Sequence, residues 1–400
     1  MKTRQKEPVW IMILRILLAA VFLFSGFTKA IDPVASAIQF EDYFISFGMG
    51  FLQPISMFCA VAMNIVEFTL GFMLLFRIKV KLTSLAYLLF MIFFLILTLW
   101  LALAEHLETN YGYNFGVVKD CGCFGKAVEM SNLQTFIKNI FIMIPTVIIF
   151  VKRKSIPDIR LTELGQWSFA AVGALAVGLL QLYCYRHLPI IDFSDWKKGN
   201  NVAEAFIEQP AEKEMVFIYR NPQDGSLMSL TTDELMEISN TTPNFYDQYE
   251  YVDRRDSILV PARMPEIAGF NMIDSTGADH SFELINENNG NILYLLFMPD
   301  LDDTSLKGLQ SANLKSIMEG AKRDGRHFAG ITNSSQQEIE IFAGQNHLDF
   351  PIYYNPIDPI KGPFMVRDAI RSNPGLIIIE RGVVTHKYAW RDFPAYNEIR

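Results

Sequence analysis

Cysteine is scarce in this 400-residue chain: there are four, and none follows Cys184. Four cysteines are too few for a fold held together by disulfides. An excess of basic residues is also missing, and the formal net charge of −8 excludes a nucleic-acid binder. Charged residues make up only 20% of the chain and apolar residues 50%, which excludes a disordered or collagen-like protein.

The charge that is present divides the chain into two unlike halves. Residues 1–185 hold 15 Lys and Arg against 11 Asp and Glu, whereas residues 186–400 hold 20 against 32. The first half consists largely of apolar runs, and the second has the composition of an acidic soluble domain. Together with the length, this predicts a membrane part followed by a soluble part.

Five apolar runs are long enough to cross a bilayer, which takes about 17–25 residues. The first follows a basic N-terminal segment of the kind found in secretory signals. Because four more runs come after it, we predict an uncleaved first helix. The predicted spans are Val9–Phe27, Phe51–Phe76, Leu82–Ala104, Leu133–Val151 and Trp167–Tyr185.

Basic residues in the connecting segments predict the orientation of these spans. The N-terminus and the second and fourth loops hold ten Lys and Arg, while the first and third loops hold three. Since positively charged segments stay on the cytoplasmic side, the N-terminus is predicted to be cytoplasmic and the chain after Tyr185 periplasmic. The predicted location is the inner (cytoplasmic) membrane of a bacterium, in contact with membrane lipid.

This topology places all four cysteines toward the oxidising face, where disulfides persist. Cys121 and Cys123 lie in the loop before the fourth span, and a bridge between them would close a small, strained and readily reduced ring. Cys59 and Cys184, in the second and fifth spans, are candidate relay thiols. Structural bridging is the main alternative to redox activity, and too few ligands lie nearby to support a metal site.

Ionisable residues also lie within the spans. Arg15 in the first span and Glu67 in the second are expected at comparable depth. Because bare charges in a bilayer are costly, we expect these two to pair and to fix helix packing. A polar contact on a proton path or with a quinone headgroup is the functional alternative. Lys29, at the outer end of the first span, is expected to extend to the membrane surface.

Several short motifs occur in the first four spans and the loop before the fourth: Leu14-Arg15, Phe24-Ser25-Gly26 with Lys29, Glu67 with Gly71, and Cys121-Gly-Cys-Phe-Gly125. Together they resemble the DoxX/MauE group of four-helix membrane proteins over about residues 9–151. The resemblance implies a bundle loosely like those of the disulfide-generating DsbB and vitamin K epoxide reductase proteins. It also implies periplasmic thiol–disulfide chemistry, which in methylamine utilisation pairs MauE with a thioredoxin-like partner, MauD. The fifth span lies outside this pattern and is expected to act as a tether.

The second half alternates strand-like and helix-like runs, which predicts a three-layer soluble α/β domain. Residues 265–395 resemble thioredoxin-like domains of the TlpA and MauD type, with Asn373-Pro374 where that fold carries its cis-proline. The dithiol motif should follow the strand ending at Met298, but the sequence there contains no cysteine. A redox-inactive domain is therefore predicted. The predicted domains are residues 1–151, 152–185 (cytoplasmic loop and fifth span), 186–264 (linker and a small α+β segment) and 265–400.

Three finer expectations concern the start of this domain. Phe270–Asp274 and Ser281–Leu284 are expected to form a hairpin. Ser305–Arg323 is expected to form one helix. The acidic run Asp300–Asp303 is expected to cap that helix rather than to bind a cation.

Two functions follow from the sequence. The one we favour is a membrane thiol–disulfide redox component that uses Cys121 and Cys123 with a periplasmic protein partner. No cofactor is evident, and a quinone is the candidate. The alternative is a non-enzymatic, membrane-anchored binding or assembly module with structural cysteines, which the missing thioredoxin motif favours.

Overall fold

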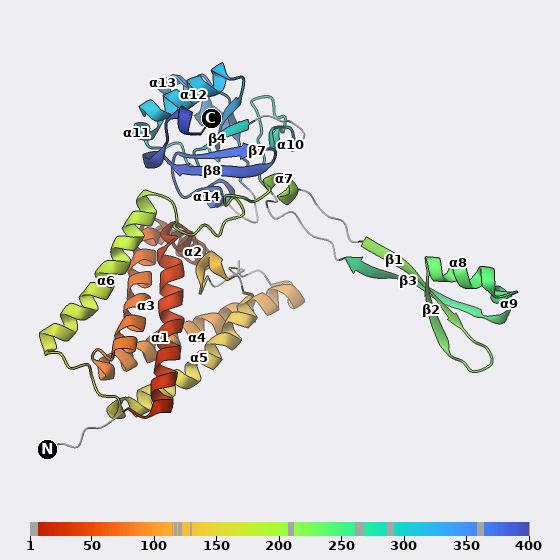
Figure 1. Ribbon diagram of the computed structural model, residues 1–400, viewed down its shortest axis with the longest axis horizontal. Coiled ribbons are helices and arrows are strands. Elements are labelled where there is room, and N and C mark those ends of the chain that lie inside the picture. Colours follow the sequence, from red (N-terminus) through yellow and green to blue (C-terminus); the bar gives the residue numbers. More distant parts are fainter. Residues whose placement is uncertain are drawn as a thin grey trace. The chain divides into compact units, whose positions relative to one another are not determined.

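The computed structural model forms two compact units (Figure 1). One consists of Met1–Asn200 and Phe270–Arg400, and the other of Asn201–Gly269. The first unit contains the apolar helices, which we call the membrane domain, and an α/β domain. The structure describes residues 7–113, 115, 118, 122–128, 130–206, 212–260, 267, 269–285, 292–357 and 364–399.

Among the described residues, five helices are long and apolar enough to cross a membrane, which confirms the five predicted spans. The chain is therefore a multi-pass membrane protein. Local signals set the helix ends: Ser131 and Gln134 form a capping box where α5 begins, and Gly112 ends α4 in the left-handed conformation. The spanning helices are α1 (Val9–Ala30), α3 (Ser56–Phe76), α4 (Val80–Tyr111), α5 (Asn132–Lys152) and α6 (Glu163–Arg186), with α2 (Pro33–Ser46) and η1 (Gly50–Ile55) between α1 and α3.

Helices α1 and α3 pack closely because glycines face the neighbouring helix. A Cβ atom placed on Gly26 would lie 2.7 Å from the backbone nitrogen of Phe68, and one on Gly71 would lie 2.9 Å from that of Leu23. Small residues allow such backbone contact in membrane helices. The two glycines therefore fix which levels of α1 and α3 lie next to each other.

Helix α6 belongs to the packed bundle, which differs from the expected tether. Gly173 of α6 lies against the ring of Phe72 of α3, where an added Cβ would approach within 2.8 Å. The side-chain amide of Asn64 donates a buried hydrogen bond of 3.0 Å to Oε1 of Gln181 on α6. The four-helix DoxX/MauE pattern has no counterpart of α6, and so the resemblance could not predict these contacts.

The α/β domain is built on a five-stranded sheet of order β6-β5-β4-β7-β8. Strands β4, β5 and β6 run parallel, while β7 is antiparallel to both β4 and β8. The predicted α/β architecture is thus confirmed, and the Asn373–Pro374 peptide bond is cis. The elements are β4 (Ile292–Phe297), α11 (Leu306–Leu309), α12 (Ala312–Arg323), β5 (His327–Thr332), α13 (Gln336–Asn346), β6 (Ile352–Tyr354), α14 (Phe364–Ala369), β7 (Gly375–Glu380) and β8 (Val383–Ala389).

Capping side chains explain where the start of this domain differs from expectation. The expected second hairpin strand is a helix, α10 (Ser281–Ile285), and Asp279 accepts a hydrogen bond from the Ser281 backbone at its start. The expected single helix is divided into α11 and α12, since the Ser311 hydroxyl caps α12 by accepting from the backbone nitrogen of Leu314. Capping by the acidic run is wrong, because Asp300 accepts instead from the backbone nitrogen of Asp302 in a local turn.

Residues 186–200, expected as linker, pack on the α/β domain. Trp196 is buried against the rings of Phe270 and Phe297. Backbone hydrogen bonds of 2.8 Å and 3.0 Å join Gly199 and Asn200 to Val384 of β8. This segment is therefore part of the first unit.

The second unit is a three-stranded antiparallel sheet of order β2-β1-β3. Its core is formed by Tyr219, Leu230 and Phe245, which pack between the sheet and the helices. The sequence predicts less for this segment: one strand-like run, Met215–Tyr219, and one helix-like run, Thr232–Ile238. The elements are α7 (Val202–Ala205), β1 (Glu212–Arg220), β2 (Leu227–Thr231), α8 (Thr232–Thr241), α9 (Phe245–Gln248) and β3 (Glu250–Val260).

Candidate functional site

The cysteine loop lies against the end of α1. Cys123 is half-buried, and the Ser25 hydroxyl donates a hydrogen bond to its backbone oxygen. Gly125 has a φ of +57°, which favours glycine, and an added Cβ there would lie 3.7 Å from the carbonyl oxygen of Thr28. The loop is thus held at the end of the bundle where α1 ends and α3 begins. Cys121 lies outside the described residues.

The three ionisable residues singled out in the spans do not pair as expected. The Lys29 ammonium binds Glu67 at 2.7 Å, and the side chains are only 11% and 6% exposed. Arg15 binds Glu7 at 2.8 Å and donates to the backbone oxygens of Leu74 and Leu75. The expected Arg15–Glu67 pair is therefore wrong, and Lys29 turns inward instead of extending to the membrane surface.

The close packing of α1 and α3 explains this difference. Arg15 meets α3 at Leu74, seven residues beyond Glu67, and at 1.5 Å per residue this is about 10 Å along the helix. Gly26 lies against Phe68, which places Glu67 near the level of Lys29. Lys29, and not Arg15, is thus the cation that the Glu67 carboxylate can reach.

A small polar cavity adjoins the cysteine loop. Its volume is about 30 Å³, enough for a water molecule. Lys138 was missed by the sequence reasoning, although a lysine inside the predicted fourth span was a readable signal. Its ammonium lies 4.4 Å from the centre of the Phe124 ring. The polar and thiol lining consists of Ser25, Lys29, Glu67, Cys123, Lys138 and Asn139.

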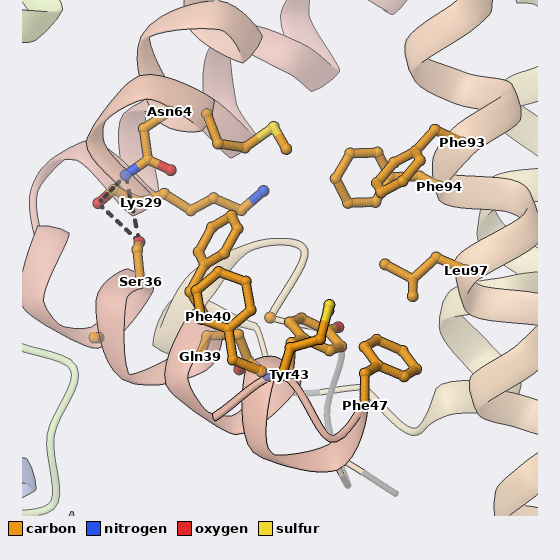
Figure 2. Close-up of a pocket in the computed structure, with 16 residues that line it drawn as sticks. Lys29, Ser36, Gln39, Phe40, Tyr43, Phe47, Asn64, Phe93, Phe94 and Leu97 are labelled. Carbon is orange, nitrogen blue, oxygen red and sulfur yellow. Dashed lines mark hydrogen bonds between the residues drawn. The ribbon is translucent and has the colours of Figure 1, made fainter. Parts of the chain in front are cut away.

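A larger cavity of about 230 Å³ lies between α2, α3 and α4. Figure 2 shows Phe40 and Tyr43 of α2, with Phe47 just after it, on one side and Phe93, Phe94 and Leu97 of α4 on the other. Gly122 and Gly125 also line it, so the cysteine loop borders this cavity too. It is an aromatic, mostly apolar space.

The polar end of the larger cavity is formed around Lys29. Its side chain extends into the space between the two aromatic walls (Figure 2). The Asn64 amide donates to the backbone oxygen of Lys29 at 3.3 Å and to the Ser36 hydroxyl at 3.4 Å. Lys29 and Phe94 line both cavities. The two spaces therefore meet at these side chains.

The other two cysteines are free thiols away from these cavities. Cys59 is half-buried on α3, and Cys184 is buried on α6. Neither lines the polar or the aromatic cavity. Their relay role stays a prediction. Across the described ranges, no group of three or more His, Cys, Asp and Glu side chains is placed to hold a metal ion.

The loop of the α/β domain where a dithiol was expected is closed by hydrogen bonds. The Thr304 hydroxyl donates to Oδ1 of Asn373 at 2.8 Å, and the Asn373 amide donates to the Asp300 backbone oxygen at 2.6 Å. These side chains supply no nucleophilic thiol. The loop is joined to the residue before the cis-proline.

These features define a multi-pass membrane protein whose bundle encloses a polar pocket beside a cysteine loop. Residues 7–152 match the family model described as methylamine utilisation protein MauE. The membrane domain is therefore similar to MauE, which confirms this part of the resemblance. No curated protein and no solved structure matches the chain. The thioredoxin-like assignment of the α/β domain stays a prediction.

Proposed function

We propose that this protein is a thiol–disulfide redox component of the inner membrane that exchanges electrons with a periplasmic protein through Cys121 and Cys123. The observation that carries the proposal is the position of Cys123, which lines the same small cavity as Lys29 and Lys138. Two ammonium groups against the one carboxylate of Glu67 favour a thiolate, the form that attacks disulfides.

The exchange has a defined electron balance. A Cys121 or Cys123 thiolate attacks a disulfide sulfur of the partner, and the partner's other sulfur leaves as a thiolate. The second loop cysteine then attacks the mixed disulfide, which leaves the loop oxidised and the partner with two reduced cysteines. The reverse sequence oxidises the partner.

For the direction in which the loop disulfide oxidises the partner and is itself reduced, we propose a quinone as the electron acceptor that reoxidises the loop; in the opposite direction a quinol would have to reduce the loop again. Oxidation of two thiols to a disulfide releases two electrons and two protons, and a quinone that takes up both becomes a quinol. The aromatic cavity supports this proposal because it is apolar, borders the cysteine loop and ends at the Lys29 ammonium.

The α/β domain, in this proposal, is thioredoxin-like but performs no exchange of its own. With no cysteine after Cys184, the domain cannot form a mixed disulfide. We expect it to present or recognise the partner on the periplasmic side. Insulin reduction by the full chain with Ser in place of all four cysteines would contradict this.

A redox titration tests the central proposal. Membranes poised at a series of potentials are alkylated, and the state of each cysteine is mapped by mass spectrometry. A Cys121–Cys123 couple with a midpoint on the order of −120 mV, as for DsbA, supports exchange. If the pair stays oxidised below about −300 mV, it is a structural bridge. Trapping of mixed disulfides on Cys123→Ser then identifies the partner.

The second candidate function is a membrane-anchored binding or assembly module. The observation that favours it is the α/β domain, in which Asn373 and Thr304 close the loop expected to carry a dithiol. A bridge that resists reduction in the titration above would select this function.

The proposed orientation has its own test. A reporter fused after Arg160 should be active only in the cytoplasm, and one after Asn200 only in the periplasm. An exported reporter at Arg160 would overturn the proposed placement of the cysteines.

A further inference from the structure

Helix α2 carries two acidic side chains that the proposed redox chemistry does not use. Asp32 is the N-cap of α2 and accepts a hydrogen bond from the backbone nitrogen of Ala35. Glu41 lies two turns further along the helix and accepts from the Ser56 hydroxyl at 3.2 Å. Both carboxylates bind arginines of the α/β domain.

The two arginines lie on and just after α14. Arg371 donates from Nε to both carboxylate oxygens of Asp32, at 3.1 Å and 3.0 Å. Arg367 donates to the two oxygens of Glu41, at 3.0 Å and 3.4 Å. Arg371 also donates to the Arg367 backbone oxygen, so the two side chains form one pair. They precede the cis-proline by a few residues.

The contact between Arg371 and Asp32 is buried. The Arg371 side chain is 4% exposed and that of Asp32 15%. Burial by itself would lower the pKa of Arg371, but Asp32 and Asp368 outweigh it and raise that pKa above its ordinary value. The charge therefore persists. Removal of Arg371 leaves the Asp32 carboxylate without its balancing charge, while removal of Asp32 leaves Arg371 with Asp368, 3.2 Å away, as its remaining partner.

Helix α2 thus joins two parts of the protein. It contributes Gln39, Phe40 and Tyr43 to the wall of the aromatic cavity. It also carries the carboxylates that bind the two arginines, Asp32 at its N-cap and Glu41 further along the helix. A movement of α2 that breaks the ion pairs would also move the cavity wall.

We propose that the α/β domain acts as a clamp on α2 of its own chain, through Arg371 on Asp32 and Arg367 on Glu41, and so holds the wall of the aromatic cavity in place. The interaction surface is the arginine pair before the cis-proline, and it fits the two carboxylates of Asp32 and Glu41. This role needs no cysteine in the α/β domain. It stands whether or not the loop cysteines are redox-active.

Hydrogen–deuterium exchange of the full chain in lipid nanodiscs tests the clamp. In Arg371→Met, the backbone amides of α2 should exchange at least tenfold faster than in the wild type. Asp32→Asn should give the same change from the membrane side, because asparagine keeps the N-cap and removes the charge. The measurement involves no redox reaction, so it succeeds or fails independently of the proposed function.

Arg326→Met is the matched control. Arg326 is a half-buried cation of the α/β domain that donates to the Tyr294 hydroxyl at 2.7 Å and, within the described part of the chain, makes no bond to α2. Exchange in α2 should stay within twofold of the wild type. An equal rise in Arg371→Met and Arg326→Met would indicate general loosening of the domain and overturn the clamp.

Arg371→Met could act by unfolding the α/β domain, and this would show as lost protection of the amides in β4 and β7. Variants that swap the charges of Glu41 and Arg367 test the clamp without removing Arg371. Glu41→Arg and Arg367→Glu should each raise α2 exchange, and the double variant should restore it to within twofold of the wild type. The clamp is wrong if α2 keeps its protection in Asp32→Asn, or if the double variant is no better protected than either single variant.

Discussion

Replacement of Glu67 by Gln should destabilise the membrane domain by about 3–5 kcal/mol. The Lys29 ammonium and the Glu67 carboxylate are 2.7 Å apart, and their side chains are 11% and 6% exposed, so water cannot take the place of the lost charge. The substitution keeps the size of the side chain and removes only the charge that balances Lys29. The energetic cost therefore reports the charge imbalance.

The double variant Lys29→Met/Glu67→Leu separates charge imbalance from lost packing. Because it removes both charges from the interior, it should recover most of the stability, to within about 1 kcal/mol of the wild type. The free energy of unfolding is measured in mixed micelles with rising SDS content, followed by helical circular dichroism. A single Glu67→Gln cost below about 1 kcal/mol, or a double variant no more stable than Glu67→Gln, would refute the reasoning.

An exposed ion pair in the same domain is the control for this experiment. Lys79 and Glu163 are 2.6 Å apart, but the Glu163 side chain is 80% exposed. Water screens such a pair and replaces its interactions. Glu163→Gln should leave the unfolding curve unchanged under conditions in which Glu67→Gln shifts it.

Two further predictions concern packing and pH. Gly71→Ala should destabilise the bundle by about 1–3 kcal/mol in the same assay, because its Cβ would lie 2.9 Å from the Leu23 backbone nitrogen, whereas Gly178→Ala, with its nearest atom at 3.7 Å, should be neutral. Hydrogen bonds to Asp274 and Glu283 raise the pKa of His280 above its usual 6.5. The wild type should therefore be more stable than His280→Gln below pH 6.5 and should lose this advantage as the pH rises through the raised pKa of His280. Thermal unfolding of both proteins at a series of pH values checks this. Equal unfolding curves at low pH would contradict it.

The spanning helices were predictable because uninterrupted apolar runs are a local property of the chain. The ends of these helices were less predictable. Helix α4 continues to Tyr111, beyond the predicted end at Ala104, since its polar last turns still form backbone hydrogen bonds until Gly112 ends them. Hydropathy identifies the lipid-crossing part of a helix, while capping identifies where the helix stops.

The partners of the buried charges were not predictable from depth alone. Arg15 and Glu67 both lie inside spans, but the register between α1 and α3 is set by the contact of Gly26 with Phe68 and of Gly71 with Leu23. Such contacts join residues far apart in sequence. A single sequence shows that charges need partners and does not show which partners are within reach.

The second unit was predicted incompletely for a related reason. Strand β3 contains the charged run Asp253-Arg254-Arg255-Asp256, which has none of the apolar alternation that identifies a half-buried strand. The strand is formed because it pairs with β1 along its length. Pairing with a neighbour, and not its own hydropathy, determines this element.

The placement of Lys29 connects the separate parts of the candidate site. Its ammonium binds Glu67, its backbone oxygen accepts from Asn64, and its side chain lines both the polar and the aromatic cavity. A proton that passes from the small cavity to the aromatic cavity would pass beside this ion pair, because Lys29 lines both. Lys29 has this position because α1 continues beyond its predicted end at Phe27 to Ala30, which keeps Lys29 within the last turn of the helix and level with Glu67. A small extension of one helix thus brings together the Lys29–Glu67 ion pair, the small polar cavity beside Cys123 and the aromatic cavity.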